Sequence, residues 1–199
     1  MIPAGLKLGY LAFVAVMVPA YLFYYGPYSF LWFSNLALLT GLLAAWFENR
    51  WLASMALVAT LLPEIGWIVS FAGGLLGVAP LRDLVSYMFD AEIPLFMRAL
   101  SLYHLPLPFV LFWMTWRLGY EPRAWRRLLI VGYAVLLLSF LLAAPGRSAN
   151  WVLGPIADEP QTWMPPLAWL AIVFGGFTLV WWTTHRLVAR NMATSRRLA

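Results

Sequence analysis

The sequence predicts an all-α integral membrane protein, a single domain over residues 1–199 that forms a bundle of six transmembrane helices. Three observations predict this fold class. Of the 199 residues, 63% are hydrophobic and only 11% are charged, whereas about a quarter of the residues of a soluble domain are charged. Apolar segments long enough to cross a bilayer recur along the chain. Lysine and arginine gather in alternate connections between those segments.

The first two helices come from one uncharged stretch. No charged residue occurs between Lys7 and Glu48, an interval of about twice the roughly 20 residues that one span needs. The turn signal of Gly26 and Pro27 divides this stretch in the middle. Along the whole chain, the predicted spans cover about 8–25, 29–47, 52–78, 93–117, 128–145 and 164–184.

The distribution of basic residues predicts the orientation. With the N-terminus inside, only Arg82 and Arg147 fall in outer connections. The inner side holds Lys7, Arg50, Arg117, Arg123, Arg126, Arg127, Arg186, Arg190, Arg196 and Arg197. This bias predicts that both termini are cytoplasmic. We expect these side chains to contact anionic lipid head groups of a bacterial inner membrane, and not nucleic acid.

Aromatic residues and glycines have expected places in such a bundle. Five tryptophans are expected to form a ring at the inner interface: Trp113, Trp116, Trp125, Trp181 and Trp182. The pairs Gly73-Gly74 and Gly175-Gly176 are expected to let helices pack closely. The longer outer loops, 79–92 and 146–163, are interpreted either as caps on the membrane surface or as simple connectors.

Polar residues within the predicted spans are the candidate functional residues, because such groups are costly in hydrocarbon. Ser34 and Asn35 lie on the second span, Glu64 on the third, and Arg98 and His104 on the fourth. Pro106 and Pro108 follow the histidine and predict a break in its helix. We expect a polar pocket in the outer half of the membrane. Trp67, on the helical face of Glu64, and Ser101, one turn before His104, are expected to line it with Asn35 and Arg98.

Two interpretations of this cluster stay open. In the first, Ser34 is a nucleophile, His104 its base and Glu64 the group that orients the histidine, with Asn35 or Arg98 stabilising an oxyanion. Ser34 and His104 differ by about 8 Å in expected depth, which weighs against it. In the second, Glu64 and Arg98 form an ion pair, and a hydrogen-bonded His104 helps to hold the bundle together.

The sequence indicates no metal or cofactor. It contains no cysteine, which excludes disulfides and thiolate ligands. One histidine and one glutamate are too few ligands for zinc, and His185 is too far from His104 for a haem held by both. Two functions follow. The chain is either a membrane protein that binds a lipid or a hydrophobic small molecule, or acts as an accessory subunit, or it is an intramembrane serine–histidine lipid hydrolase or acyltransferase.

Several motifs resemble an uncharacterised bacterial family of membrane-associated proteins. They are Tyr25-Gly26-Pro27, Phe30-Leu31-Trp32-Phe33-Ser34, Leu62-Pro63-Glu64, Tyr87-Met88-Phe89-Asp90, Leu100-Ser101-Leu102-Tyr103-His104, Asn150-Trp151-Val152-Leu153-Gly154-Pro155 and Pro160-Gln161-Thr162-Trp163. More distantly, the layout is similar to the androgen-induced intramembrane hydrolases and their bacterial YwaF-like relatives, which have about six helices. That resemblance implies Ser34 as nucleophile, where those enzymes have Thr or Cys, and His104 as base.

Overall fold

The computed structural model describes residues 1–144, 146–155 and 160–195. About 76% of the chain is helical, and the one β feature in the described part is an isolated bridge between Ala144 and Arg147. The all-α prediction is confirmed. Arg196 and Arg197, two of the predicted inner cations, lie outside the described residues.

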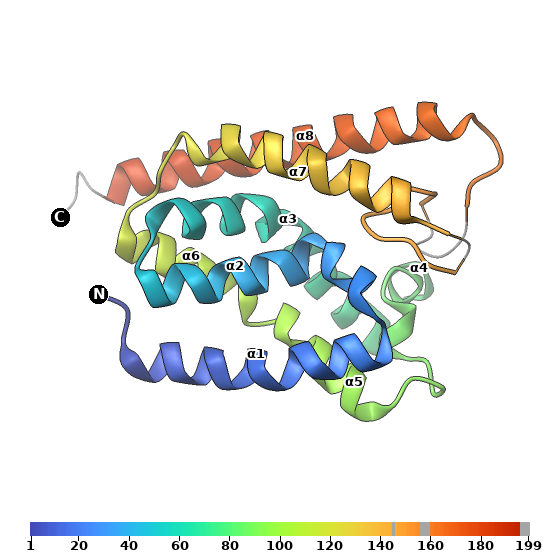
Figure 1. Cartoon of the computed structure of the whole chain (residues 1–199), viewed down its shortest axis with the longest axis horizontal. Helices are drawn as coiled ribbons and strands as arrows, with labels where there is room; N and C mark the ends of the chain where they lie inside the picture. The colour runs from blue at the N-terminus through green and yellow to red at the C-terminus, as the bar shows by residue number, and fades with distance from the viewer. Residues whose placement is uncertain (145, 156–159, 196–199) are drawn as a thin grey trace.

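The helices follow one another with short connections. In order they are α1 (Ala4–Tyr24), the 3-10 turn η1 (Pro27–Leu31), α2 (Phe33–Phe47), α3 (Arg50–Leu75), α4 (Ala79–Asp83), η2 (Ser86–Met88), α5 (Leu95–Ser101), η3 (Leu102–His104), α6 (Leu107–Leu118), α7 (Ala124–Leu142) and α8 (Pro166–Ser195). Figure 1 shows α1 along one side of the bundle and α7 with α8 along the other, with α2, α3 and α6 between them. Helix α3 is the centre, since it contacts α2, α4, α6, α7 and α8.

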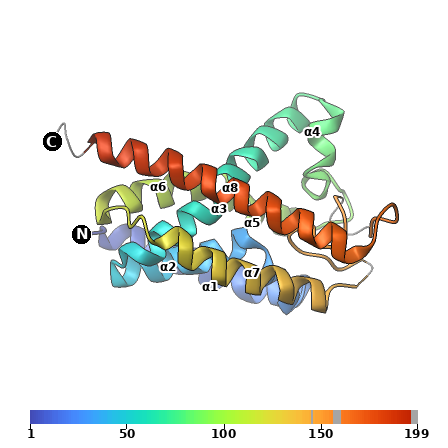
Figure 2. The ribbon, with the colours of Figure 1, turned by 90° about the horizontal axis from the view of Figure 1, so that it is seen from above.

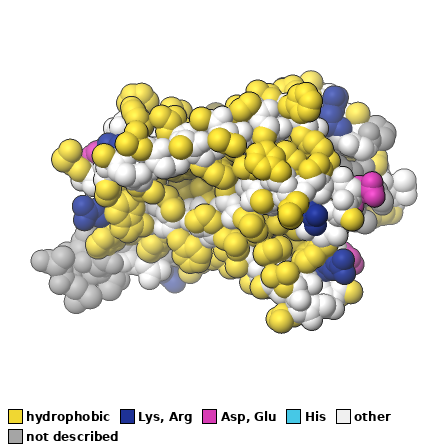
Figure 3. All heavy atoms as spheres, turned by 90° about the horizontal axis from the view of Figure 1, so that it is seen from below, with side chains coloured by type: hydrophobic (Ala, Val, Ile, Leu, Met, Phe, Trp, Pro, Cys, Tyr) yellow, Lys and Arg dark blue, Asp and Glu magenta, His cyan; other side chains and the backbone are white. Residues whose placement is uncertain are grey.

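Five helical segments are long and apolar enough to cross a membrane: Ala4–Tyr24, Arg50–Leu75, Leu95–Leu118, Ala124–Leu142 and Pro166–Met192. Large apolar side chains project outward from them, among them Phe23, Phe109 and Ile130. Figure 3 shows one face of the molecule, on which a wide apolar band separates charged side chains gathered towards the two ends. A surface of this kind suits a protein surrounded by lipid, because no such band would stay exposed in water.

Helix α2 differs from the predicted span at 29–47. It begins at Phe33 and has 15 residues, so it extends over about 22 Å, less than the roughly 30 Å of a bilayer core. Ser29 to Leu31 belong to η1 instead. Beside the start of α2, residues 146–155 fold inward, and Ala149 and Val152 are buried.

Asn150 joins this inward loop to the start of α2. Its Oδ1 accepts a hydrogen bond from the Phe33 backbone N–H at 3.1 Å, and its Nδ2 donates to the Leu31 carbonyl at 2.8 Å and to Ser139 Oγ at 3.2 Å. The side chain is 1% exposed. It therefore satisfies an N–H of the first turn of α2 that would otherwise lack a partner at this depth.

Packing inside the bundle corrects two expectations. Trp181 is fully buried and lies against Gly132, where a Cβ atom would collide with its ring, so it is a core residue and not part of an interfacial ring. A Cβ at Gly73 or Gly74 would meet Leu81 or Phe89, which confirms close packing there. The prediction for Gly175 and Gly176 is wrong, because a Cβ at either would meet open space.

The connection over residues 79–92 packs against the bundle. Helix α4 folds back on the end of α3, and Val85 and Met88 are buried. Figure 2 shows α4 at the end of α3, standing out from the main body of the molecule. This segment is therefore folded against the end of α3, and the expectation of a cap on the membrane surface stays a prediction.

Ion pairs tie together the other end of the molecule, where the predicted inner connections lie. Lys7 Nζ is 2.8 Å from Glu48 Oε1, and Arg50 Nη2 is 3.0 Å from Glu121 Oε2. The hydrogen bond from Lys7 lowers the pKa of the Glu48 carboxyl, which also accepts from the Ile2 backbone N–H. These contacts join the N-terminus to the α2–α3 connection, and α3 to the α6–α7 connection.

Replacing Asn150 with glycine should lower the free energy of unfolding by about 2 kcal/mol, because buried partners lose their hydrogen bonds. Glycine keeps the left-handed backbone of this position (φ 55°) without strain. Thermal unfolding in detergent measures the change. The matched control is Asn49→Gly, since Asn49 caps α3 at an exposed position and its loss should cost only a few tenths of a kcal/mol. Equal losses in the two variants would contradict the role given to Asn150.

Candidate functional site

The predicted break beside His104 is confirmed. Helix α5 ends at Ser101, residues Leu102–His104 form the 3-10 turn η3, and α6 begins at Leu107. Pro106 and Pro108 cannot donate backbone hydrogen bonds, so the regular helix cannot run through this point. The interruption turns the histidine towards α3 about midway along the Leu95–Leu118 segment.

Glu64 lies opposite, near the middle of α3 and directly after Pro63. Its Oε2 is 2.6 Å from His104 Nδ1. The glutamate side chain is 2% exposed and that of the histidine 12%. A short, enclosed contact between a carboxyl group and an imidazole is strong, because no water competes for either partner.

Aromatic rings clamp the imidazole on both faces. The Tyr103 ring stacks on one side at 4.2 Å between centroids and the Trp67 ring stacks at 4.7 Å. Phe71 in turn stacks on Trp67 at 5.1 Å. With its faces covered and Nδ1 engaged by Glu64, the ring of His104 is held in one orientation.

The second ring nitrogen of His104, Nε2, is not contacted by Glu64. Within the described part of the chain it has no hydrogen-bond partner, and it is not among the enclosed polar atoms. An electroneutral Glu64–His104 pair is favoured in hydrocarbon, where a net charge is costly. In both arrangements of an electroneutral pair, the carboxylate with imidazolium and the carboxylic acid with imidazole, Nε2 carries a proton. An electroneutral pair would therefore present a hydrogen-bond donor at Nε2.

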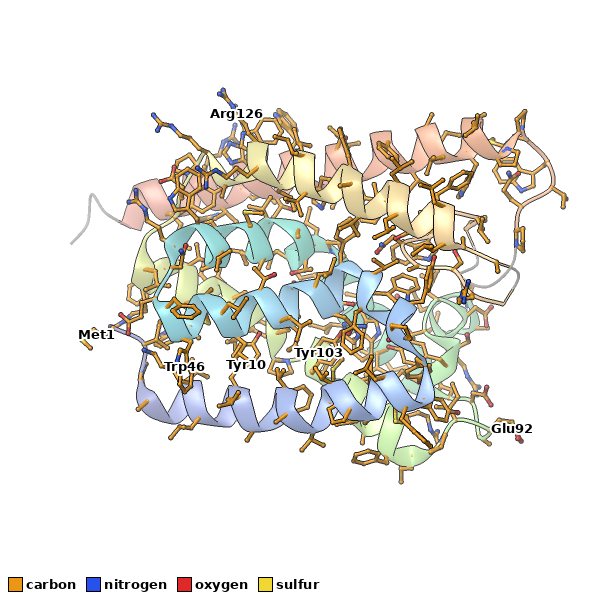
Figure 4. All side chains as sticks on the ribbon, in the orientation of Figure 1. Met1, Tyr10, Trp46, Glu92, Tyr103 and Arg126 are labelled. Atoms are coloured by element: carbon orange, nitrogen blue, oxygen red, sulfur yellow. The ribbon has the colours of Figure 1, made fainter. Side chains whose placement is uncertain are left out.

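Asn35 supports Tyr103 and does not face an open pocket. The Tyr103 hydroxyl donates to Asn35 Oδ1 at 2.6 Å, and Asn35 Nδ2 donates to the Ser29 carbonyl at 2.8 Å. Figure 4 shows Tyr103 between α1 and α2. Both ends of the Asn35 amide are thus engaged within the chain, and its predicted role in ligand binding stays a prediction.

Ser34 does not form the predicted triad. Its side chain adjoins the Tyr103 hydroxyl, and no hydrogen bond joins it to His104. Ser34 instead adjoins Tyr103, whose ring stacks on the His104 imidazole at 4.2 Å between centroids. Of the three predicted catalytic residues, the structure brings together Glu64 and His104.

Arg98 is also placed differently from the prediction. Its Nη1 donates to the Met88 carbonyl at 3.4 Å, and its Nε is enclosed without a partner. The predicted Glu64–Arg98 ion pair is wrong, because His104 takes the acid. Arg98 lies six residues before His104, about 9 Å along a helix, where η2 folds against α5.

Trp67 and Ser101 lie at the site with two tyrosines that the sequence analysis did not select. Ser101 Oγ is 2.7 Å from the Tyr21 hydroxyl, and Trp67 Nε1 donates to the Tyr87 hydroxyl at 2.8 Å. Burial raises the pKa of the Tyr87 hydroxyl, so it stays protonated. The signal for Tyr21 was present in the sequence, because a tyrosine within an apolar span needs a partner for its hydroxyl.

The arrangement is a filled polar network around one exposed donor. Its serine, asparagine and tyrosine groups are engaged in hydrogen bonds within the chain. A groove that the structure shows lies elsewhere, between α7 and α8. The polar pocket expected from the sequence stays a prediction, centred on His104 Nε2 and the aromatic rings around it.

Comparisons of the chain with protein-family models, with curated proteins and with solved structures found no match. What the site can do is therefore inferred from its own residues.

Glu64→Leu alone should destabilise the protein by about 3 kcal/mol, because it leaves the partly buried His104 without its partner. The double variant Glu64→Leu with His104→Leu should lose less stability than the two single variants lose in sum. Thermal unfolding of the four proteins in detergent measures the coupling. Arg98→Leu is the control, since its loss should add independently to that of Glu64→Leu. Additive losses in the Glu64–His104 cycle would show that the two side chains do not act as a pair.

Proposed function

We propose that the chain crosses the bacterial inner membrane six times, with both termini in the cytoplasm. Helix α2 would be a short sixth crossing, completed by the inward loop at residues 146–155. The start of α1 and the end of α8 lie at the same end of the bundle in Figure 1, as an even number of crossings requires. The excess of basic residues in the connections at that end supports a cytoplasmic location.

The proposed function is to bind a neutral, lipid-soluble molecule through a carbonyl oxygen that accepts a hydrogen bond from His104 Nε2. The observation that carries it is the Glu64–His104 contact of 2.6 Å, which leaves a fixed N–H donor without a partner in the described part of the chain. A donor at this depth gains a partner only from a ligand, since neighbouring lipid tails offer none. Acyl esters and quinones both carry such an oxygen.

Depth and neutrality narrow the class of ligand. Glu64 and His104 lie near the middle of their membrane segments, about 15 Å from a head-group layer. Phosphate and other charged head groups do not reach this level at low cost. Apolar residues Leu102 and Phe109 are exposed on either side of the histidine along its segment. The site therefore suits a ligand that dissolves in the core of the bilayer.

Nuclear magnetic resonance of the protein with ¹⁵N-labelled histidine tests this proposal. The chain has two histidines, and His185, paired with the Tyr120 hydroxyl at 2.6 Å, is an internal reference. The protein is placed in nanodiscs of an ether-linked phosphatidylcholine, which has no carbonyl groups. Addition of methyl oleate or of a decyl benzoquinone should produce a saturable shift of the His104 Nε2 signal, whereas squalene, which has no oxygen, should not.

A response to methyl oleate alone would assign an acyl ester, and a response to the quinone alone would assign a quinone. No response to either, or an equal response to squalene, would overturn the proposal. A fluorophosphonate probe tests the hydrolase predicted from Ser34. Labelling that disappears in both Ser34→Ala and His104→Ala would favour the hydrolase over a binding protein.

A further inference from the structure

A second site lies on the opposite side of the bundle from α1. Where α7 and α8 lie side by side, a groove of about 430 Å³ opens on the exterior of the bundle. Trp125 and Trp182 form one end of it, and Tyr133 and Phe174 the other. None of these residues belongs to the Glu64–His104 site, so the groove is independent of the function proposed above.

Glycine keeps the groove open. Gly175 lies in its wall, and a Cβ atom at that position would meet nothing within 4 Å. The hydroxyl groups in the groove are already paired, since those of Tyr133 and Thr178 are 2.5 Å apart and Thr178 also donates to the Phe174 carbonyl. The groove therefore presents a mainly apolar surface, which suits a hydrocarbon chain.

Two cations lie at the tryptophan end of the groove. The Arg186 guanidinium lies 5.6 Å from the centre of the Trp182 ring. Arg126 follows Trp125, and Figure 4 shows it pointing away from the bundle near the start of α7. Trp125 and His185 stack at 5.4 Å, which places the two arginines at the same level. Within the described residues, neither arginine forms an ion pair with a carboxylate.

We propose that this groove binds one anionic glycerophospholipid of the surrounding bilayer. One acyl chain would lie in the groove, and the phosphate would contact Arg126 and Arg186. From Trp125 to Tyr133 the groove follows about 12 Å of helix, close to the roughly 15 Å thickness of the hydrocarbon of one leaflet. Its charged end and its apolar length thus match the two parts of an inner-leaflet lipid.

Native mass spectrometry tests the proposal on the full chain. The protein is reconstituted in nanodiscs of equal parts dioleoyl phosphatidylglycerol and dioleoyl phosphatidylcholine, then released, and the retained lipids are identified. We expect one phosphatidylglycerol to be retained in preference to phosphatidylcholine. Gly175→Leu should fill the groove and abolish retention. Gly9→Leu is its control, because a Cβ at Gly9 on α1 also meets open space.

Charge variants test the head-group contact separately. Arg126→Gln and Arg186→Gln should each reduce the preference for phosphatidylglycerol about fivefold. Arg117→Gln is the control, because Arg117 also lies over a tryptophan, 5.9 Å from the Trp113 ring, but away from the groove.

Three results would overturn the proposal. They are equal retention of the two lipids by the unaltered protein, retention unaffected by Gly175→Leu, and a lipid-free dimer that Gly175→Leu dissociates. The last would show that a second copy of the chain occupies the groove.

Discussion

The structure depends on one constraint, that a polar group inside a bilayer must find its partner within the protein. Glu64 meets it by pairing with His104 across α3 and η3. Asn150 supplies the hydrogen-bond partner of the Phe33 N–H at the buried start of α2. Tyr103, Asn35 and Ser29 meet the constraint in a chain of hydrogen bonds. The same requirement explains why the proline-broken segment is tolerated, since its irregular backbone is packed against α3.

The pairing has a consequence for function. The Glu64 carboxyl group holds Nδ1 of the histidine, and the rings of Tyr103 and Trp67 stack on its imidazole. A histidine held in this way offers its remaining nitrogen in a defined direction. The groove between α7 and α8 is a different kind of site, because Gly175 leaves its wall open and the proposed selectivity would come from the arginines at one end.

The helical class, the long apolar segments and the break at His104 could be predicted from the sequence. The length of apolar segments, the spacing of charges and the effect of proline all depend on residues that are close together in the chain. The sequence analysis also selected Glu64 and His104, since ionisable groups in apolar spans are conspicuous. It chose the wrong partner for Glu64, because the relative depth of Arg98 and His104 depends on where η3 interrupts the helix. It missed the short α2 for a similar reason, since the loop containing Asn150 is distant in sequence from Phe33. Trp181 was misplaced because burial against Gly132 is set by helix packing.

Electron paramagnetic resonance tests most directly whether hydrocarbon surrounds the Glu64–His104 level. The chain has no cysteine, so single cysteines can carry a nitroxide at Ile65 and Phe109, whose side chains are 43% and 68% exposed, and at Ser86 in η2 as reference. In nanodiscs, labels at Ile65 and Phe109 should collide often with oxygen and rarely with a water-soluble nickel chelate, while the label at Ser86 should show the reverse. Contact of the chelate with Ile65 and Phe109 as frequent as with Ser86 would contradict this account.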